Sequence, residues 1–384
     1  MKLDNNLQAF FAVVRAGLWA DLESTDIRNQ GFTESVNWGK IYQLAEEQSV
    51  LGVVLAGIER LKNDNTYPNL NIPQELLLQW IGEVQMFEQQ NKAMNQFIAK
   101  VIEKLRREDV YTILLKGQGV AQCYERPLWR SCGDVDLLLS DNNYKKAKNV
   151  LIPWASSVEP ESIYGKHLGL TIDSWAVELH GTQHTELSYR IDKVIDAVQD
   201  NQFCQRNVRS WSNGKTQVFL PSPDNDVFFI FTHFLKHFYK GGLGLRQICD
   251  WCRFLWTYRE LLNHGLLESR IRKAGLMTEW MAFGAFAVDY LGIPSEAIPF
   301  YSAEKKWLRK AKRIQEFVMR VGNMGHNRDN DYYGNSPFAV RKCISFGRRL
   351  ADVLNHVKIF PIDSIRFFPS MVFNGLKLAA KGVG

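Results

Sequence analysis

The chain has 384 residues, a formal net charge of +6 and 46% hydrophobic residues, an ordinary composition for a folded globular protein. Its length allows two or three domains, each with its own core. No stretch approaches the roughly 20 apolar residues of a membrane span, and the first residues lack a signal-peptide pattern, so we expect a cytoplasmic protein. The mildly basic charge permits a polyanionic partner, such as nucleic acid or nucleotide phosphates, without requiring one.

The first hundred residues predict helices. Apolar residues recur at three- and four-residue spacing over 7–20, 37–62 and 74–107. Pro73 stands just before the third of these segments and suits the first turn of a helix. We therefore expect an N-terminal helical region over residues 1–108.

The pattern changes at Val110, where short β-branched and apolar runs replace the helical period. An amphipathic helix is expected over 144–154, and Asp173 with Ser174 is expected to form a tight turn. Four runs predict strands, at 110–117, 134–140, 167–173 and 175–181. The alternation of strands and helices predicts an α+β fold with a small mixed sheet over 109–186, flanked by helical regions.

Three of the acidic residues on these strands are candidates for a common site. Asp134 and Asp136 are two positions apart, so their carboxylates leave one face of a strand, where two like charges are costly unless something offsets them. A hard divalent ion binds carboxylate oxygens directly, and Glu178 on a later strand would complete a site of three acids. The alternative is a pair of strand-end acids bridged to Arg126 or Arg130.

The motif Lys116-Gly117-Gln118-Gly119 follows the first strand and opens a helix. Its glycines let the backbone approach a ligand, while helix-start N–H groups and the Lys116 charge favour phosphate. An ordinary tight turn is the alternative. With the acids, the motif predicts phosphoryl chemistry that uses Mg²⁺ or Mn²⁺, with His180 as a substrate contact or general base. A histidine that is merely hydrogen-bonded at a strand end remains open.

From 187 onward helices are expected again, most plainly over 188–199, 224–240 and 243–261, with a long loop at 322–337. Six polar residues lie on the segments around the turn at 239–247. We expect them to line the cleft, and an ordinary solvated helix surface is an equal alternative. The six are His233, Lys236, His237, Arg246, Gln247 and Asp250. His233 and His237 share a helix face, but zinc would lack a third ligand in view.

The segment 114–139 combines a Lys-Gly turn, a short helix, an arginine and Gly-Asp-Val-Asp-Leu on a strand. It resembles the uncharacterised bacterial nucleotidyltransferase family of the polymerase-β-like superfamily, and the similarity continues from about 110 to 255. The resemblance implies a polymerase-β-like nucleotidyltransferase core. It also implies Asp134 and Asp136 as metal ligands, with Glu178 as the third acid. The phosphate turn of that superfamily usually contains Gly-Ser or Gly-Gly. Here Gly117 is followed by Gln118, which departs from that pattern.

The expected function is transfer of a nucleoside monophosphate from an NTP such as ATP to a hydroxyl of a small molecule, sugar, protein or RNA. The residues leave the acceptor and the oligomeric state open. One alternative is a catalytically inactive nucleotide-binding or regulatory protein on the same fold. Another is a nucleic-acid-binding module with a footprint at 305–313. The residues expected to bind phosphate or contact substrate are Lys116, Gly117, Gln118, Gly119, Arg130, Arg246, His180 and His237.

Overall fold

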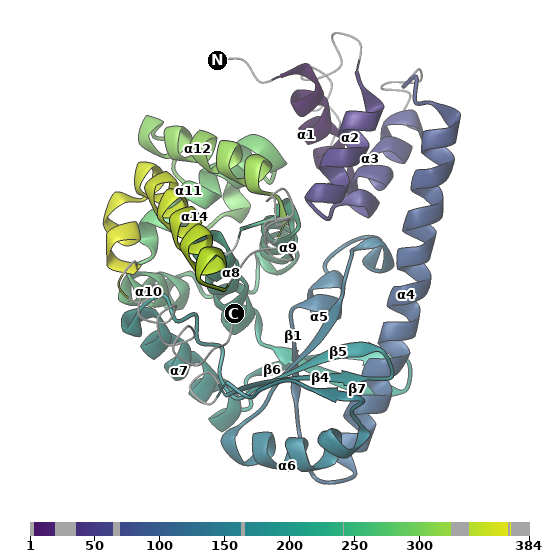
Figure 1. Ribbon diagram of the computed structural model, residues 1–384, viewed down its shortest axis with the longest axis vertical. Helices are drawn as coiled ribbons and strands as arrows, with labels where there is room; N and C mark the ends of the chain where they lie inside the picture. Colours follow the sequence, from purple (N-terminus) through teal and green to yellow (C-terminus); the bar gives the residue numbers. More distant parts are fainter. Residues whose placement is uncertain are drawn as a thin grey trace.

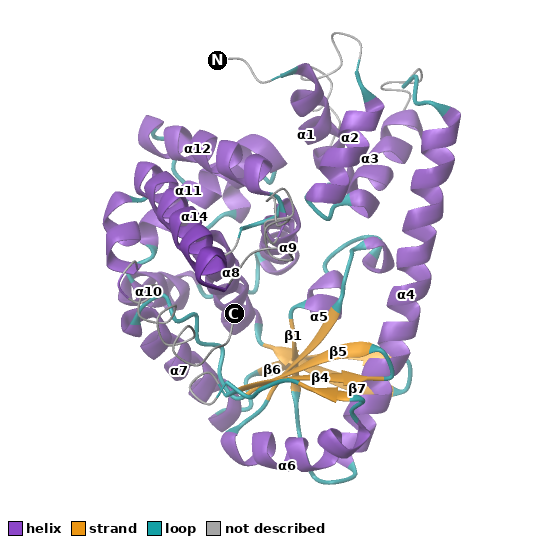
Figure 2. Ribbon diagram, in the orientation of Figure 1, coloured by secondary structure: helices purple, strands orange, loops and turns teal. Residues whose placement is uncertain are grey.

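Three regions follow one another along the chain: N-terminal helices, a small sheet and C-terminal helices (Figure 1, Figure 2). The structure confirms an α+β protein with a small mixed sheet and flanking helices. None of the helices described is both long and apolar enough to cross a membrane. The structure is a computed structural model, and it describes residues 4–19, 36–63, 70–162, 166–240, 242–323, 338–367 and 369.

The described part of the N-terminal region contains four helices, α1 (Asn5–Leu18), α2 (Trp38–Glu47), α3 (Leu51–Asn63) and α4 (Gln74–Arg106). The helical segment predicted over 37–62 is confirmed as two helices, because Ser49 adopts a positive φ of 55° and separates α2 from α3. Gly17 and Gly57 let α1 and α3 cross in close backbone contact. α4 runs from these helices down to the sheet (Figure 1).

The sheet has five strands in the order β1-β2-β5-β4-β3. β2 pairs with β5 in parallel, and the other pairs are antiparallel. All four predicted strands are confirmed. The sequence analysis did not predict the short edge strand β3. The bounds are Ile113–Leu115 for β1, Asp134–Leu138 for β2, Ser157–Val158 for β3, His167–Ile172 for β4 and Trp175–His180 for β5.

Four helical segments connect the described strands: α5 (Gly117–Ala121), α6 (Asp141–Leu151) and the 3-10 turns η1 (Pro127–Trp129) and η2 (Ile152–Trp154). Side chains on a strand alternate between its two faces, so Leu137 and Leu179 pack into an apolar cluster with α4 and α6. The opposite face of the sheet carries the polar side chains Asp134, Asp136, His167, Glu178 and His180.

The C-terminal region begins with α7 (Tyr189–Cys204) and then contains a β-hairpin of β6 (Val208–Asn213) and β7 (Thr216–Pro221). This hairpin corrects our expectation that the region 187–384 consists of helices and loops. Phe219 of the hairpin packs beside Leu115 and Leu138 of the sheet. The hairpin therefore extends the folded core beyond the range 109–186.

The remaining helices enclose an aromatic core that includes Trp251 and Trp280, which meet edge to face. The expected basic footprint at 305–313 lies in α12, where Trp307 is buried. The loop expected at 322–337 lies largely outside the described residues. The bounds are Pro223–Lys240 for α8, Leu245–Tyr258 for α9, His264–Ala274 for α10, Met277–Phe286 for α11, Lys305–Val321 for α12 and Phe338–Ile359 for α14.

Candidate functional site

Three carboxylates meet on the polar face of the sheet. The parallel register sets Asp136 directly beside Glu178, and Asp134 lies two positions earlier on the same face. One oxygen from each carboxylate lies within 4.8 Å of the other two. These side chains line a pocket of about 370 Å³ between the sheet and the C-terminal helices. The structure thus brings together the three acids that the sequence singled out.

The charge of this acidic cluster is offset unevenly. The buried Asp136 Oδ1 accepts from Lys116 Nζ at 3.0 Å and from His180 Nε2 at 2.7 Å. Burial opposes ionisation, but the Lys116 charge and the His180 hydrogen bond hold the pKa of Asp136 below its ordinary value. Repulsion from Asp136, together with burial, raises the pKa of Asp134. The negative charge of Asp134 is therefore the less compensated of the two, and a cation beside it would be stabilised.

The alternative explanation for the acids, salt bridges to nearby arginines, does not hold. Arg126 pairs with Glu59, and Arg130 pairs with Asp250 through two hydrogen bonds of 3.0 and 2.6 Å. Arg130 and Asp250 are both buried. Arg130 lines the pocket, yet the carboxylate of Asp250 already holds its guanidinium, so its main effect is to fix the segment before β2.

Lys116 stands at the turn from β1 into α5. Its backbone has φ 48° and ψ −138°, a region that residues with a side chain rarely adopt, and Gly117 follows at φ 37°. The turn directs Lys116 Nζ between Asp136 and His233 Nε2, the latter at 3.2 Å. Burial opposes the charge, but the Asp136 carboxylate raises the pKa of Lys116 above its ordinary value. The pocket thus keeps a charged ammonium.

The other half of the motif faces inward. Gln118 is buried and donates from Nε2 to Asn91 Oδ1 at 2.6 Å. A Cβ on Gly119 would lie 2.7 Å from Leu220 Cδ2, so this glycine allows close packing against β7. Lys116 and Gly117 line the pocket, whereas Gln118 and Gly119 lie behind it. The departure at Gln118 therefore changes the support of the turn and leaves the pocket surface intact.

The opposite side of the pocket is formed by α8 and α9. All six members of the polar cluster expected in the sequence line it. His233 and His237 lie with their Nε2 atoms 3.2 Å apart. Burial, and then the Lys116 charge, lower the pKa of His233 far below its ordinary value and that of His237 to about 4. Both imidazoles are therefore neutral at neutral pH.

Arg246 is the second arginine at the pocket. Its Nη1 donates to Ser131 O at 3.2 Å, while its buried Nε has no hydrogen-bond partner within the described part of the chain. A buried donor without a partner costs free energy that a bound acceptor would recover. Arg246 is thus better placed than Arg130 to bind an anionic ligand.

We call the two sides of the pocket the sheet wall and the helical wall. The sheet wall consists of Asp134, Asp136, His167, Glu178 and His180, and the helical wall consists of His233, Lys236, His237 and Arg246. Lys116 connects the two walls through its contacts with Asp136 and His233.

His167 is the member of the sheet wall that the sequence analysis missed. Its Nε2 lies 3.1 Å from Glu178 Oε2, and His180 Nε2 lies 3.3 Å from the same oxygen. Hydrogen bonds from His167 and His180 hold the pKa of Glu178 well below its ordinary value. The tight turn predicted at 173–174 carried the missing signal, because it pairs His167 with His180 across the hairpin.

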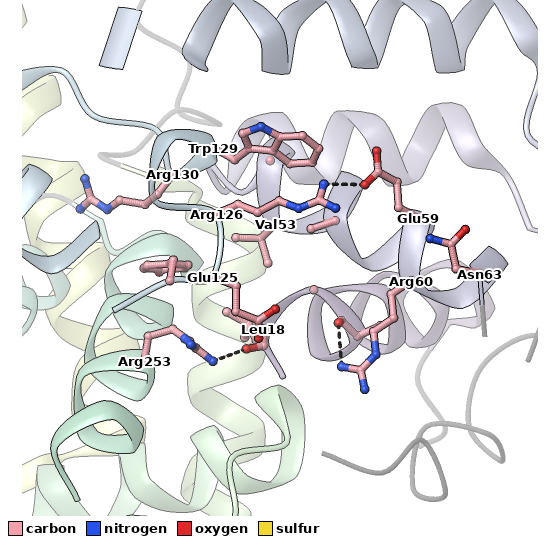
Figure 3. Close-up of a pocket in the computed structure, with 15 residues that line it drawn as sticks. Leu18, Val53, Glu59, Arg60, Asn63, Glu125, Arg126, Trp129, Arg130 and Arg253 are labelled. Atoms are coloured by element: carbon pink, nitrogen blue, oxygen red, sulfur yellow. Dashed lines mark hydrogen bonds and ion pairs between the residues drawn. The ribbon is translucent and has the colours of Figure 1, made fainter. Parts of the chain in front are cut away.

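A second pocket, of about 320 Å³, lies between α1, α3 and the segment 124–130 (Figure 3). Its charged side chains are already engaged: Arg126 bonds Glu59, and Arg253 donates to Leu18 O at 2.5 Å. Arg130 lines both pockets and turns away from the second toward Asp250. Arg130 is thus common to both pockets, but none of the three acids lines this second pocket.

A family model described as "uncharacterised nucleotidyltransferase" matches residues 34–292. The matched range includes the sheet and both walls of the pocket. Searches of curated proteins and of solved structures gave no match.

Proposed function

The chain belongs to this uncharacterised nucleotidyltransferase family, and we propose from that premise that it uses Mg²⁺ or Mn²⁺ to transfer a nucleoside monophosphate from an NTP to a hydroxyl acceptor. A polymerase-β-like core is part of the proposal. The observation that carries it is the convergence of Asp134, Asp136 and Glu178 in one pocket.

The donor atoms fit a hard divalent ion. Asp134, Asp136 and Glu178 offer carboxylate oxygens, which Mg²⁺ prefers over nitrogen or sulfur. The raised pKa of Asp134 reports repulsion that a cation would relieve. The bound ion would supply charge stabilisation for the leaving pyrophosphate.

The basic groups opposite the acids suit a triphosphate. Lys116 provides a charged ammonium. Arg246 provides a buried Nε–H that has no acceptor within the described part of the chain. His233 and His237 are neutral, so they add hydrogen-bonding groups without adding charge that would compete with Lys116. We propose that these groups bind and orient the phosphates, with His237 as a substrate contact.

His180 orients the acids. Burial opposes its charge, but hydrogen bonds to Asp136 and Glu178 raise the pKa of His180 above its ordinary value. Carboxylate oxygens only accept hydrogen bonds, so His180 Nε2 is the donor toward both acids and cannot also accept a proton. We therefore favour His180 as the group that holds the two carboxylates in position, over its role as a general base for the acceptor hydroxyl.

Calorimetric titration of each of the four common NTPs with Mg²⁺ tests this proposal. We expect the wild-type chain to bind at least one of them, and Asp134→Asn/Asp136→Asn to lose that binding. Asp196→Asn is the matched control, because Asp196 pairs with His184 at the pocket rim and is not one of the three acids. Thermal melting verifies that each variant is folded. Equal affinity in the double variant, or no binding by the wild type, would reject the proposed site.

A further inference from the structure

The β4–β5 hairpin places three metal-ligating side chains on one face. Asp173 and Ser174 both have positive φ, as a two-residue type I′ turn requires, and this turn fixes the register of the strands. His167 lies directly opposite His180, and Glu178 precedes His180 by two positions. Backbone pairing alone therefore brings two imidazoles and one carboxylate together.

The separations of these groups match the edges of a metal site. Bonds of about 2.0–2.2 Å to a tetrahedral zinc ion place neighbouring ligand atoms about 3.3–3.6 Å apart. The two imidazole Nε2 atoms lie 3.1 and 3.3 Å from Glu178 Oε2. All three ligand atoms lie within 4.8 Å of one another, close enough to bind one ion.

The donor chemistry differs from that of the neighbouring acids. Two imidazole nitrogens and one carboxylate form a set typical of zinc sites that keep an open position, whereas oxygen-only sets suit Mg²⁺. The side chains of His167 and Glu178 are 33% and 35% exposed, so water can reach the open side. An ion can therefore enter from solvent and retain a water molecule.

We propose that His167, Glu178 and His180 form a second cation site, which takes a borderline divalent ion such as Zn²⁺ and shares Glu178 with the acids at Asp134 and Asp136. Ligation through His180 Nε2 would break the hydrogen bond between this atom and Asp136 Oδ1. The site follows from hairpin geometry and goes beyond the proposed nucleotidyl transfer, which requires the three acids alone.

Co²⁺ is a suitable probe, because its visible absorption reports coordination number and nitrogen ligands. The full-length chain is stripped with a chelator, which is then removed, and titrated with Co²⁺ in the presence of excess Mg²⁺ and without nucleotide. We expect one equivalent to bind, with an absorption spectrum of low coordination number, and Zn²⁺ to displace it. Excess Mg²⁺ occupies oxygen-only sites and so confines the signal to the site with imidazoles.

Two substitutions separate this site from its neighbours. His167→Ala removes a ligand that lies outside the three acids, and we expect Co²⁺ affinity to fall by at least about 10–100-fold, the loss seen when even an outer partner of a ligand is removed. His184→Ala is the matched control, because His184 also pairs with a carboxylate at the pocket rim, that of Asp196. This control is expected to bind Co²⁺ as the wild type does.

The outcomes are distinct from those of the nucleotide titration. Unchanged Co²⁺ affinity in His167→Ala, or a wild-type spectrum of six oxygen ligands, would overturn the second site while leaving the three-acid proposal intact. Asp134→Asn is expected to retain Co²⁺ binding even if it loses nucleotide binding. Loss of Co²⁺ from Asp134→Asn with no loss from His167→Ala would assign the ion to the acids and reject the hairpin site.

Discussion

The sheet wall and the helical wall face the same pocket but depend on different kinds of structure. Strand register places every side chain of the sheet wall, so residues two apart or directly paired must meet. The helical wall comes from α8 and α9, whose polar groups are held at the pocket by the aromatic core packed behind them. Positions in the sheet wall are thus set by strand pairing, and positions in the helical wall depend on the packing of the C-terminal helices.

The largest effect is expected from the acids of the sheet wall. Asp134→Asn and Asp136→Asn should each lower the rate of pyrophosphate release at least about 10³-fold, since metal charge stabilisation contributes several kcal/mol. The melting temperature of Asp134→Asn should stay near that of the wild type, because Asp134 is only partly buried. A near-normal rate in either variant would remove that acid from the catalytic assignment.

Glu178→Gln should lower the same rate about 10²-fold, because the amide keeps the shape of the side chain but loses its charge. It should also weaken Co²⁺ binding, since Glu178 lies in both ligand groups. Rates with Mg²⁺ and Co²⁺ titration of the same preparation make the comparison. A normal rate with weakened Co²⁺ binding would restrict Glu178 to the hairpin site.

Lys116→Gln tests the connection between the walls. We expect KM for the nucleotide to rise about 10–100-fold, the equivalent of a hydrogen bond to a charged group at about 1.5–3 kcal/mol. Lys116→Arg should recover part of this loss, because it restores the charge. If KM is unchanged and only the melting temperature falls, Lys116 is a structural counter-ion of Asp136.

The smallest expected effect concerns the pH dependence of stability. It tests the buried contact between Tyr239 and Glu279, which lies behind the helical wall. Tyr239 of α8 donates to the buried Glu279 at 3.1 Å, and burial followed by repulsion from Asp363 raises the pKa of Glu279 to about 8. Because the folded state holds this proton more tightly than the unfolded state, stability is lost as pH rises from the ordinary carboxyl pKa through about 8.

Denaturant melts at about pH 6 and about pH 9 should therefore show a loss of a few kcal/mol in the wild type, and a smaller loss in Glu279→Gln, which has no proton to release. Nucleotide-independent Co²⁺ binding should persist at the higher pH as long as the chain is folded. An equal pH dependence in both proteins would show that Glu279 does not govern the stability of the helical region.

Sequence reasoning located most of the sheet wall, since Asp134, Asp136 and Glu178 stand at positions where period-two alternation leaves one direction for their side chains. His167 was missed because its role depends on strand register, which only the turn at 173–174 determines. Gln118 was expected at the phosphates, but its direction depends on contact with Asn91 of α4, far away in the sequence.

The hairpin of β6 and β7 was missed for a different reason. Arg209, Ser210 and Ser212 give β6 a polar sequence that lacks an apolar alternation, although Gly214, with a φ of 60°, marks its turn. Its burial comes from packing on β1 and α4, which no local pattern records.

The backbone at Lys116 shows what this pocket requires of the chain. A residue with a side chain in that conformation costs about 1–3 kcal/mol, and glycine would relieve the cost. Glycine would also remove the ammonium that pairs with the buried Asp136, and an unpaired buried carboxylate costs about 3–5 kcal/mol. The ion pair thus outweighs the backbone strain, so a screen for thermostable variants should retain the lysine at this turn.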